Sequence, residues 1–162
     1  MLSRGEKRLH VVATLARKNV LEAPITERLV EAAIRALSLS HPRNPPNLQF
    51  GAAVLAASGE IYTASAFWSD SLTLAIHAEH AALVHAAMHG DRSIVAIACV
   101  STEDPEGKQF CHTCGLCRQV IYESRLESQT EIAIYMANLK GEYLDKTISE
   151  LMTFPWPPPK CE

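Results

Sequence analysis

The chain has 162 residues, which is enough for one domain to bury a core of its own. Hydrophobic residues make up 48% of the chain and charged residues 20%, a balance that excludes an intrinsically disordered protein. The formal net charge of −3 gives no overall attraction to a polyanion, so we expect a small-molecule partner and no nucleic acid.

The first predicted element is a short basic helix over residues 4–20, and we treat residues 1–24 as a helical extension that precedes a domain at 25–162. A second helix is expected after Thr26, which would act as its N-cap, with apolar residues on one side. The proline-rich sequence HPRNPPN then ends this helix in a surface loop.

The next elements alternate between strands and helices. Residues 51–57 and 60–66 flank Ser58-Gly59 and predict a β-hairpin. An alanine-rich helix is expected from His77 to His89, with Gly90 as its stop.

The second half of the chain repeats the alternation of buried strands and helices. Residues 93–101 and 130–137 are apolar runs typical of buried strands, and a helix over 114–124 lies between them. A last short helix is expected over 147–152. Two strand–helix–strand units after a hairpin predict an α/β protein with a layered, mixed sheet.

The cysteines indicate a reducing compartment. Three of the five lie between Cys111 and Cys117, and such crowding favours metal binding over a disulfide framework. No apolar run approaches the length of a membrane span, and the first residues lack the long apolar region of a secretory signal. The sequence therefore predicts a cytoplasmic protein without a membrane partner.

The predicted metal ligands are Cys114, Cys117 and His77. Spaced three apart at a helix start, the two cysteine sulfurs face one way, and the helix dipole there favours thiolates. His77 begins another helix, and adjacent strand–helix units bring both helix starts to one sheet edge. Three such ligands suit a catalytic Zn²⁺ that keeps a fourth position for water. Glu79, two residues past His77, is the predicted proton-transfer group.

These residues resemble those of a known family. His77-Ala78-Glu79 followed by Cys114-Gly-Leu-Cys117 is similar to the H-x-E…P-C-x-x-C signature of the zinc-dependent cytidine deaminase superfamily. GAAVLAASGEIYTASA is similar to the family's first hairpin. CGLCRQVIYES is similar to the cysteine helix of the free-nucleoside members, a group that includes blasticidin-S-deaminase-like relatives.

The resemblance implies a three-layer α/β/α fold around a mixed five-stranded sheet. It implies one Zn²⁺ per chain to acidify water, Glu79 to carry protons to the ring and to the departing ammonia, and the Ala78 N–H to hold the pyrimidine carbonyl. It also implies a nucleoside-like substrate and a homotetramer, or a homodimer, with sites at subunit interfaces.

The chain departs from the family where the sugar would bind. The family's Asn-x-Glu pair, which grips the ribose, falls on Ala66 and Trp68, whose side chains cannot replace those hydrogen bonds. Trp68 either stacks on a substrate or fills core space. The family's aromatic residue facing the base corresponds to Leu48 or Phe50. These changes favour a modified nucleoside, or another aminated heterocycle, over ordinary cytidine.

Several alternatives stay open around the ligands. Thr113 stands where the family usually has proline, and it is a good helix cap. Cys111 and His112 either line the approach to the site or complete a four-ligand structural zinc site. The alternative function is a non-catalytic, zinc-containing nucleoside-binding protein, which would not need Glu79.

Overall fold

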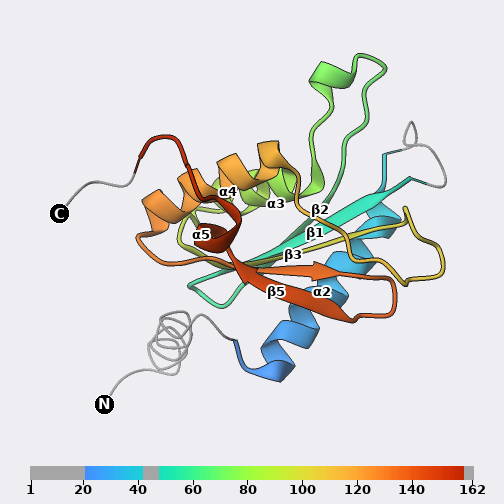
Figure 1. Cartoon of the computed structure of the whole chain (residues 1–162), viewed down its shortest axis with the longest axis horizontal. Helices are drawn as coiled ribbons and strands as arrows, with labels where there is room; N and C mark the ends of the chain where they lie inside the picture. Colours follow the sequence, from blue (N-terminus) through green and yellow to red (C-terminus); the bar gives the residue numbers. More distant parts are fainter. Residues whose placement is uncertain (1–20, 42–47, 159–162) are drawn as a thin grey trace.

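The computed structural model describes residues 21–41 and 48–158, so most of the predicted extension over 1–24 and most of the proline-rich loop lie outside it. The elements form an α/β arrangement (Figure 1). In chain order they are α2 (Ala23–Ala36), η1 (Leu37–Leu39), β1 (Phe50–Ala56), β2 (Ile61–Ser65), η2 (Leu72–Leu74), α3 (Ala78–Met88), β3 (Ile94–Ser101), α4 (Gly115–Ser128), β4 (Ala133–Ala137), β5 (Tyr143–Thr147) and α5 (Ile148–Leu151). Among the described helices, none has the length and apolarity that crossing a membrane requires.

The five strands form one mixed sheet in the order β2-β1-β3-β4-β5. β1 pairs antiparallel with both β2 and β3. β3 pairs parallel with β4, and the helix α4 connects these two strands along the chain. β5 returns antiparallel to β4. β2, β3 and β4 therefore run in the same direction, so the loops that follow β2 and β3 begin at the same edge of the sheet. The mixed five-stranded sheet is confirmed.

Helices cover both faces of this sheet (Figure 1). Alternate residues of β1 point to opposite sides: Ala53 and Leu55 join the core under α2, whereas Ala52 and Val54 join the core under α3, α4 and α5. Burial on both faces is why β1 and β3 read as continuous apolar runs in the sequence. The predicted three-layer α/β/α fold is confirmed.

The helix α2 begins earlier than the sequence predicted. Its N-cap is Glu22, and Pro24 lies in its first turn, where a missing N–H leaves no hydrogen bond unmade. Thr26 is instead buried inside the helix, and its hydroxyl donates to the Glu22 carbonyl at 3.4 Å. The predicted capping role of Thr26 is therefore wrong.

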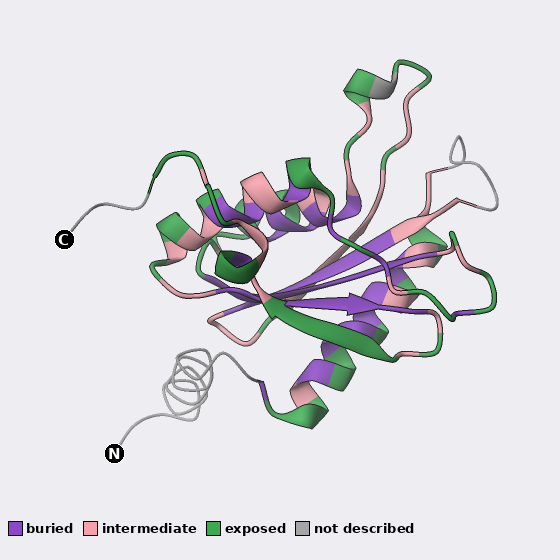
Figure 2. Cartoon of the chain, in the orientation of Figure 1, coloured by how far each residue is buried: buried purple, intermediate pink, exposed green. Residues whose placement is uncertain are grey.

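The strand β5 carries no apolar signal in the sequence. Its residues are mostly exposed, and Figure 2 shows it as an exposed edge beside the buried β4. Backbone pairing with β4 and the α5 capping box that follows, in which Thr147 and Glu150 bond each other's backbone, hold it in place. The alternation of apolar and polar residues in the sequence could therefore not show which residues form the fifth strand.

The segment between β2 and α3 extends away from the body of the protein (Figure 1). Its two sides are joined near their base, where Phe67 and Ile76 exchange backbone hydrogen bonds of 2.9 Å in each direction. This bridge fixes the position of Trp68, which directly follows Phe67, relative to the start of α3.

Candidate active site

The predicted ligands lie at the starts of α3 and α4, on the sheet edge where β2 and β3 end. His77 is the N-cap of α3 and Cys114 is the N-cap of α4, both with extended backbone. Cys117 lies in the first turn of α4. Ligands commonly bind at this edge of α/β sheets, since the strand-to-helix loops converge there.

The three ligand side chains converge closely enough to share one ion. The Cys114 and Cys117 sulfurs each lie 3.3 Å from His77 Nδ1, and the three donor atoms lie within 4.8 Å of one another. One nitrogen and two sulfurs are donors that Zn²⁺ accepts in tetrahedral sites. In the described part of the chain, neither Cys111 nor His112 joins this group. The donor set fits one Zn²⁺ with a fourth position left for another ligand.

Without a metal, the surroundings of Cys117 favour its neutral thiol over the thiolate. Burial raises the pKa of the Cys117 thiol, and the Glu79 carboxylate and Cys114 raise it further. A divalent metal beside the sulfur would supply the charge that stabilises the thiolate.

A cavity of ≈ 260 Å³ opens beside these ligands. Among the predicted site residues, it is lined by His77, Ala78, Glu79, Cys114, Phe50, Ala66 and Trp68. Leu48 is not among the described residues that line it. Of the two residues that could correspond to the family's aromatic residue facing the base, Phe50 is therefore the better placed. Glu79 is only 7% exposed and lies in the first turn of α3. Cys111 and His112 also line the cavity.

Four residues of the cavity wall were not predicted from the sequence. Phe67, Ala75 and Ile76 line it from the segment before α3, and Glu103 lines it from the loop after β3. The position of Glu103 in the sequence could have identified it as a site residue, because it is a carboxylate two residues beyond the end of β3, at the sheet edge where His77 was expected.

Thr113 does not cap α4. Its side chain is buried, with its hydroxyl 3.6 Å from the Cys99 sulfur, and α4 has no side-chain cap. Arg118 instead holds the turn, because its Nε donates to the Thr113 carbonyl at 2.8 Å. The turn before Cys114 is thus fixed from inside the helix that follows it, and the predicted cap is wrong.

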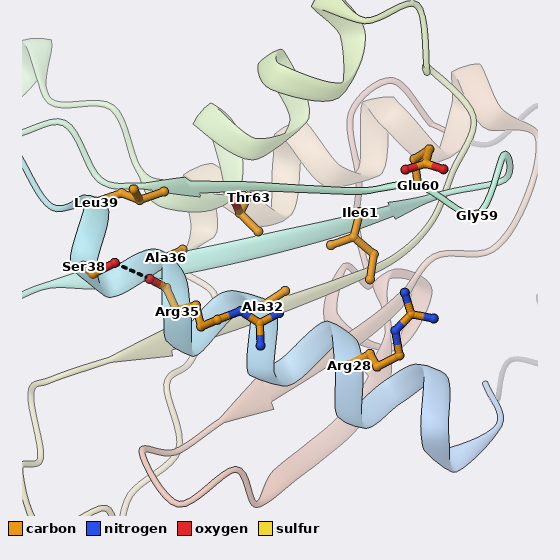
Figure 3. A pocket seen from close by; sticks show the side chains of 10 residues that line it. All are labelled: Arg28, Ala32, Arg35, Ala36, Ser38, Leu39, Gly59, Glu60, Ile61 and Thr63. Carbon is orange, nitrogen blue, oxygen red and sulfur yellow. Dashed lines mark hydrogen bonds between the residues drawn. The ribbon is translucent and has the colours of Figure 1, made fainter.

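A larger cavity of ≈ 540 Å³ lies elsewhere, between α2, η1 and β2 (Figure 3). Arg28 of α2 points across it toward Glu60 and Ile61, whereas Arg35 lies farther along the helix. The Ser38 hydroxyl donates to the Arg35 carbonyl at 2.8 Å. No histidine or cysteine is among the described residues that line this hollow, so it offers neither soft metal ligands nor a nucleophilic thiol.

The chain is similar to proteins of one family. A family described as the cytidine and deoxycytidylate deaminase zinc-binding region matches residues 24–133. A cytidine deaminase of Halalkalibacterium halodurans is 35% identical over 64% of this chain and 74% of its own length. A cytidine deaminase of Sporosarcina psychrophila is 35% identical over 63% of this chain and 70% of its length. The crystal structure of a cytidine deaminase from Burkholderia pseudomallei superposes with a TM-score of 0.69 at 26% identity, covering 80% of this chain and 97% of that one.

Proposed function

We propose that this chain, which belongs to the cytidine and deoxycytidylate deaminase family, hydrolyses the exocyclic amino group of a free cytosine nucleoside or a close relative of one. One observation carries the proposal: a three-donor zinc group and a buried glutamate adjoin the same cavity. A structural zinc site would use four protein ligands, and a binding protein would not need Glu79.

The side chains divide into ligands and a proton carrier. His77, Cys114 and Cys117 would hold one Zn²⁺, which when bound makes water acidic enough to serve as a nucleophile near neutral pH. Glu79 would take one proton from that water and deliver it to the ring nitrogen, and it would then move the proton of the added hydroxyl to the leaving amine. Ala78 is the first residue of α3, so its N–H has no partner within the helix and would donate to the pyrimidine carbonyl.

The cavity wall suits an uncharged, flat ligand. Phe50, Phe67 and Trp68 offer aromatic faces, and no lysine or arginine is among the described residues that line the cavity. A nucleotide phosphate would meet no such cation and would lie near the carboxylates of Glu79 and Glu103. We therefore favour a free nucleoside over a nucleotide.

The sugar side of the site differs from the family pattern. Ala66 and Trp68 both line the cavity at the two positions where the family's sugar-binding pair is expected. Neither can accept a hydrogen bond through its side chain. Modified or non-standard nucleosides are therefore candidate substrates beside cytidine and deoxycytidine.

Large apolar side chains on the surface support a homotetramer or a homodimer. On α3, Met88 is 82% exposed and Val84 46% exposed. In the tail, Phe154 is 96% and Trp156 73% exposed, although the backbone there is held to α4 by the Tyr122 hydroxyl, which donates to the Pro157 carbonyl. Size-exclusion chromatography with light scattering should give a mass of two or four chains.

A cytoplasmic location stays a prediction.

Ammonia release from zinc-loaded protein tests the proposed function. The panel would hold cytidine, deoxycytidine, base- and sugar-modified cytosine nucleosides and adenosine, and the variants would be Glu79→Gln and Glu127→Gln. Glu127 is an exposed glutamate that pairs with Arg92 on the surface, so its variant should keep activity. Glu79→Gln should lower release about 100-fold or more while zinc stays bound. Ligand binding without any release, in both wild type and variant, would favour the non-catalytic alternative.

A further inference from the structure

We propose that Glu103 is the residue that recognises the sugar hydroxyls, in place of the family pair that is lost at Ala66 and Trp68. The inference rests on the proposed function, because it assumes that the cavity holds a nucleoside. Glu103 lines the same cavity as Ala66 and Trp68 but comes from a different element, the loop that follows β3.

The backbone on the N-terminal side of Glu103 is firmly held. Ser101 is the register partner of Phe50, so the end of β3 lies beside the aromatic wall of the cavity. Thr102 then bonds Gln49 twice: its N–H donates to the Gln49 carbonyl at 2.9 Å, and its hydroxyl accepts from the Gln49 N–H at 2.9 Å. These bonds fix where the Glu103 side chain begins.

The backbone on the C-terminal side is held by the next residue. Asp104 accepts hydrogen bonds from three backbone N–H groups of its own loop, those of Glu106, Lys108 and Gln109. The bond from Gln109, together with those from Lys108 and Glu106, lowers the pKa of Asp104 although burial opposes the shift. Both Asp104 oxygens are thus engaged in holding the turn.

The same loop is also tied to the strand β4. The buried Asn138, which follows β4, donates from its amide to the Gly107 carbonyl at 2.9 Å, and Cys111 donates from its N–H to the Ala137 carbonyl at 3.0 Å. The loop that carries Glu103 therefore has anchors at its start, its middle and its end. The backbone that carries Glu103 is thus positioned before a ligand arrives, which reduces the entropy lost on binding.

The carboxylate of Glu103 differs from that of Asp104 in its contacts. One oxygen, Oε2, accepts the Ser101 hydroxyl at 3.1 Å, which orients the group. Among the described residues, no lysine, arginine or histidine forms an ion pair with Glu103. An oriented carboxylate of this kind has acceptor capacity left for hydroxyl donors, and it repels anions. The chemistry it would recognise is a neutral nucleoside with free sugar hydroxyls.

Equilibrium binding tests the inference without requiring turnover. The probes are uridine and 2′,3′-dideoxyuridine, which differ in the sugar hydroxyls and have no amino group to lose. Titration calorimetry would compare zinc-loaded wild type with Glu103→Gln and Glu103→Ala. The control is Glu106→Gln, which alters an exposed glutamate of the same loop that pairs with Lys108 and leaves the backbone bond to Asp104 in place.

We expect wild type and Glu106→Gln to bind uridine about 10- to 100-fold more tightly than the dideoxy analogue. Glu103→Gln and Glu103→Ala should bring that ratio close to one by weakening uridine alone. An unchanged ratio in both Glu103 variants, a ratio of one in wild type, or no binding of either probe would overturn the assignment. Ammonia release by wild type, lost in Glu79→Gln, would in each case show that the proposed function stands by itself.

Discussion

Replacing Gly51 by alanine should destabilise the protein strongly, because α2 lies directly on β1 at this point. A Cβ at residue 51 would lie 2.4 Å from the Ala33 carbonyl oxygen and 3.2 Å from the Leu37 nitrogen, whereas real Cβ contacts stay above 3.0 Å. Both atoms belong to the backbone, so no flexible side chain can move aside. The helix or the strand must shift, and we expect a cost of about 3 kcal/mol, the upper end of the usual range for overpacking.

For a chain of this size that cost corresponds to a fall in Tm of about 6–12 °C. Urea unfolding of the metal-free protein, followed by circular dichroism, would give the change in the free energy of unfolding. Gly115→Ala is the matched control, because a Cβ at that helical position meets nothing within 4 Å. It should be neutral or stabilise the protein by up to about 1 kcal/mol. If Gly51→Ala were as stable as Gly115→Ala, the close contact between α2 and β1 would be refuted.

Three further predictions concern single contacts. Cys117→Ser should lower the zinc content measured by atomic absorption well below one per chain, whereas Cys99→Ser, outside the donor group, should not; equal zinc in both would contradict the ligand set. The bond from the Tyr62 hydroxyl to Asp91 at 2.7 Å raises the pKa of Tyr62 to about 12. Since the folded state favours the protonated phenol, the stability from this group is present below about pH 10 and is lost as the pH rises through 12. Asp91→Asn should move one phenol titration in the ultraviolet spectrum toward pH 10, and an unmoved titration would argue against the bond. Thr147→Ala removes the cap of α5 and should cost about 1 kcal/mol in urea unfolding; an unchanged midpoint would show that β4 pairing alone holds β5.

The parts of the site that the sequence predicted are those set by short spacing. His77 and Glu79 are separated by one residue, and Cys114 and Cys117 by two, so each pair has a fixed local geometry once its helix is placed. The strands β1 and β3 are buried on both faces, which leaves a long apolar run that no loop would show. Together these local signals were enough to predict the edge of the sheet at which the donors meet.

The parts that the sequence did not reveal depend on contacts that neither residue type nor periodicity shows. β5 exists because its backbone pairs with β4, and its exposed side chains carry no pattern. Thr113 looks like a cap by residue type, but the buried Cys99 lies beside it in space. Glu103 joins the cavity wall because β3, which ends two residues before it, is paired with β1, and because its own loop is anchored.

The most direct test of the central claim is the origin of the oxygen in the product. Zinc-loaded protein would be incubated in ¹⁸O-labelled water with the nucleoside that releases ammonia fastest, and the mass of the product would be measured by mass spectrometry. Hydrolysis at the cavity predicts one ¹⁸O atom per product molecule, formed together with one ammonia, and almost no product with Glu79→Gln. Product without ¹⁸O, or as much product from Glu79→Gln as from wild type, would contradict a hydrolytic deaminase that uses this glutamate.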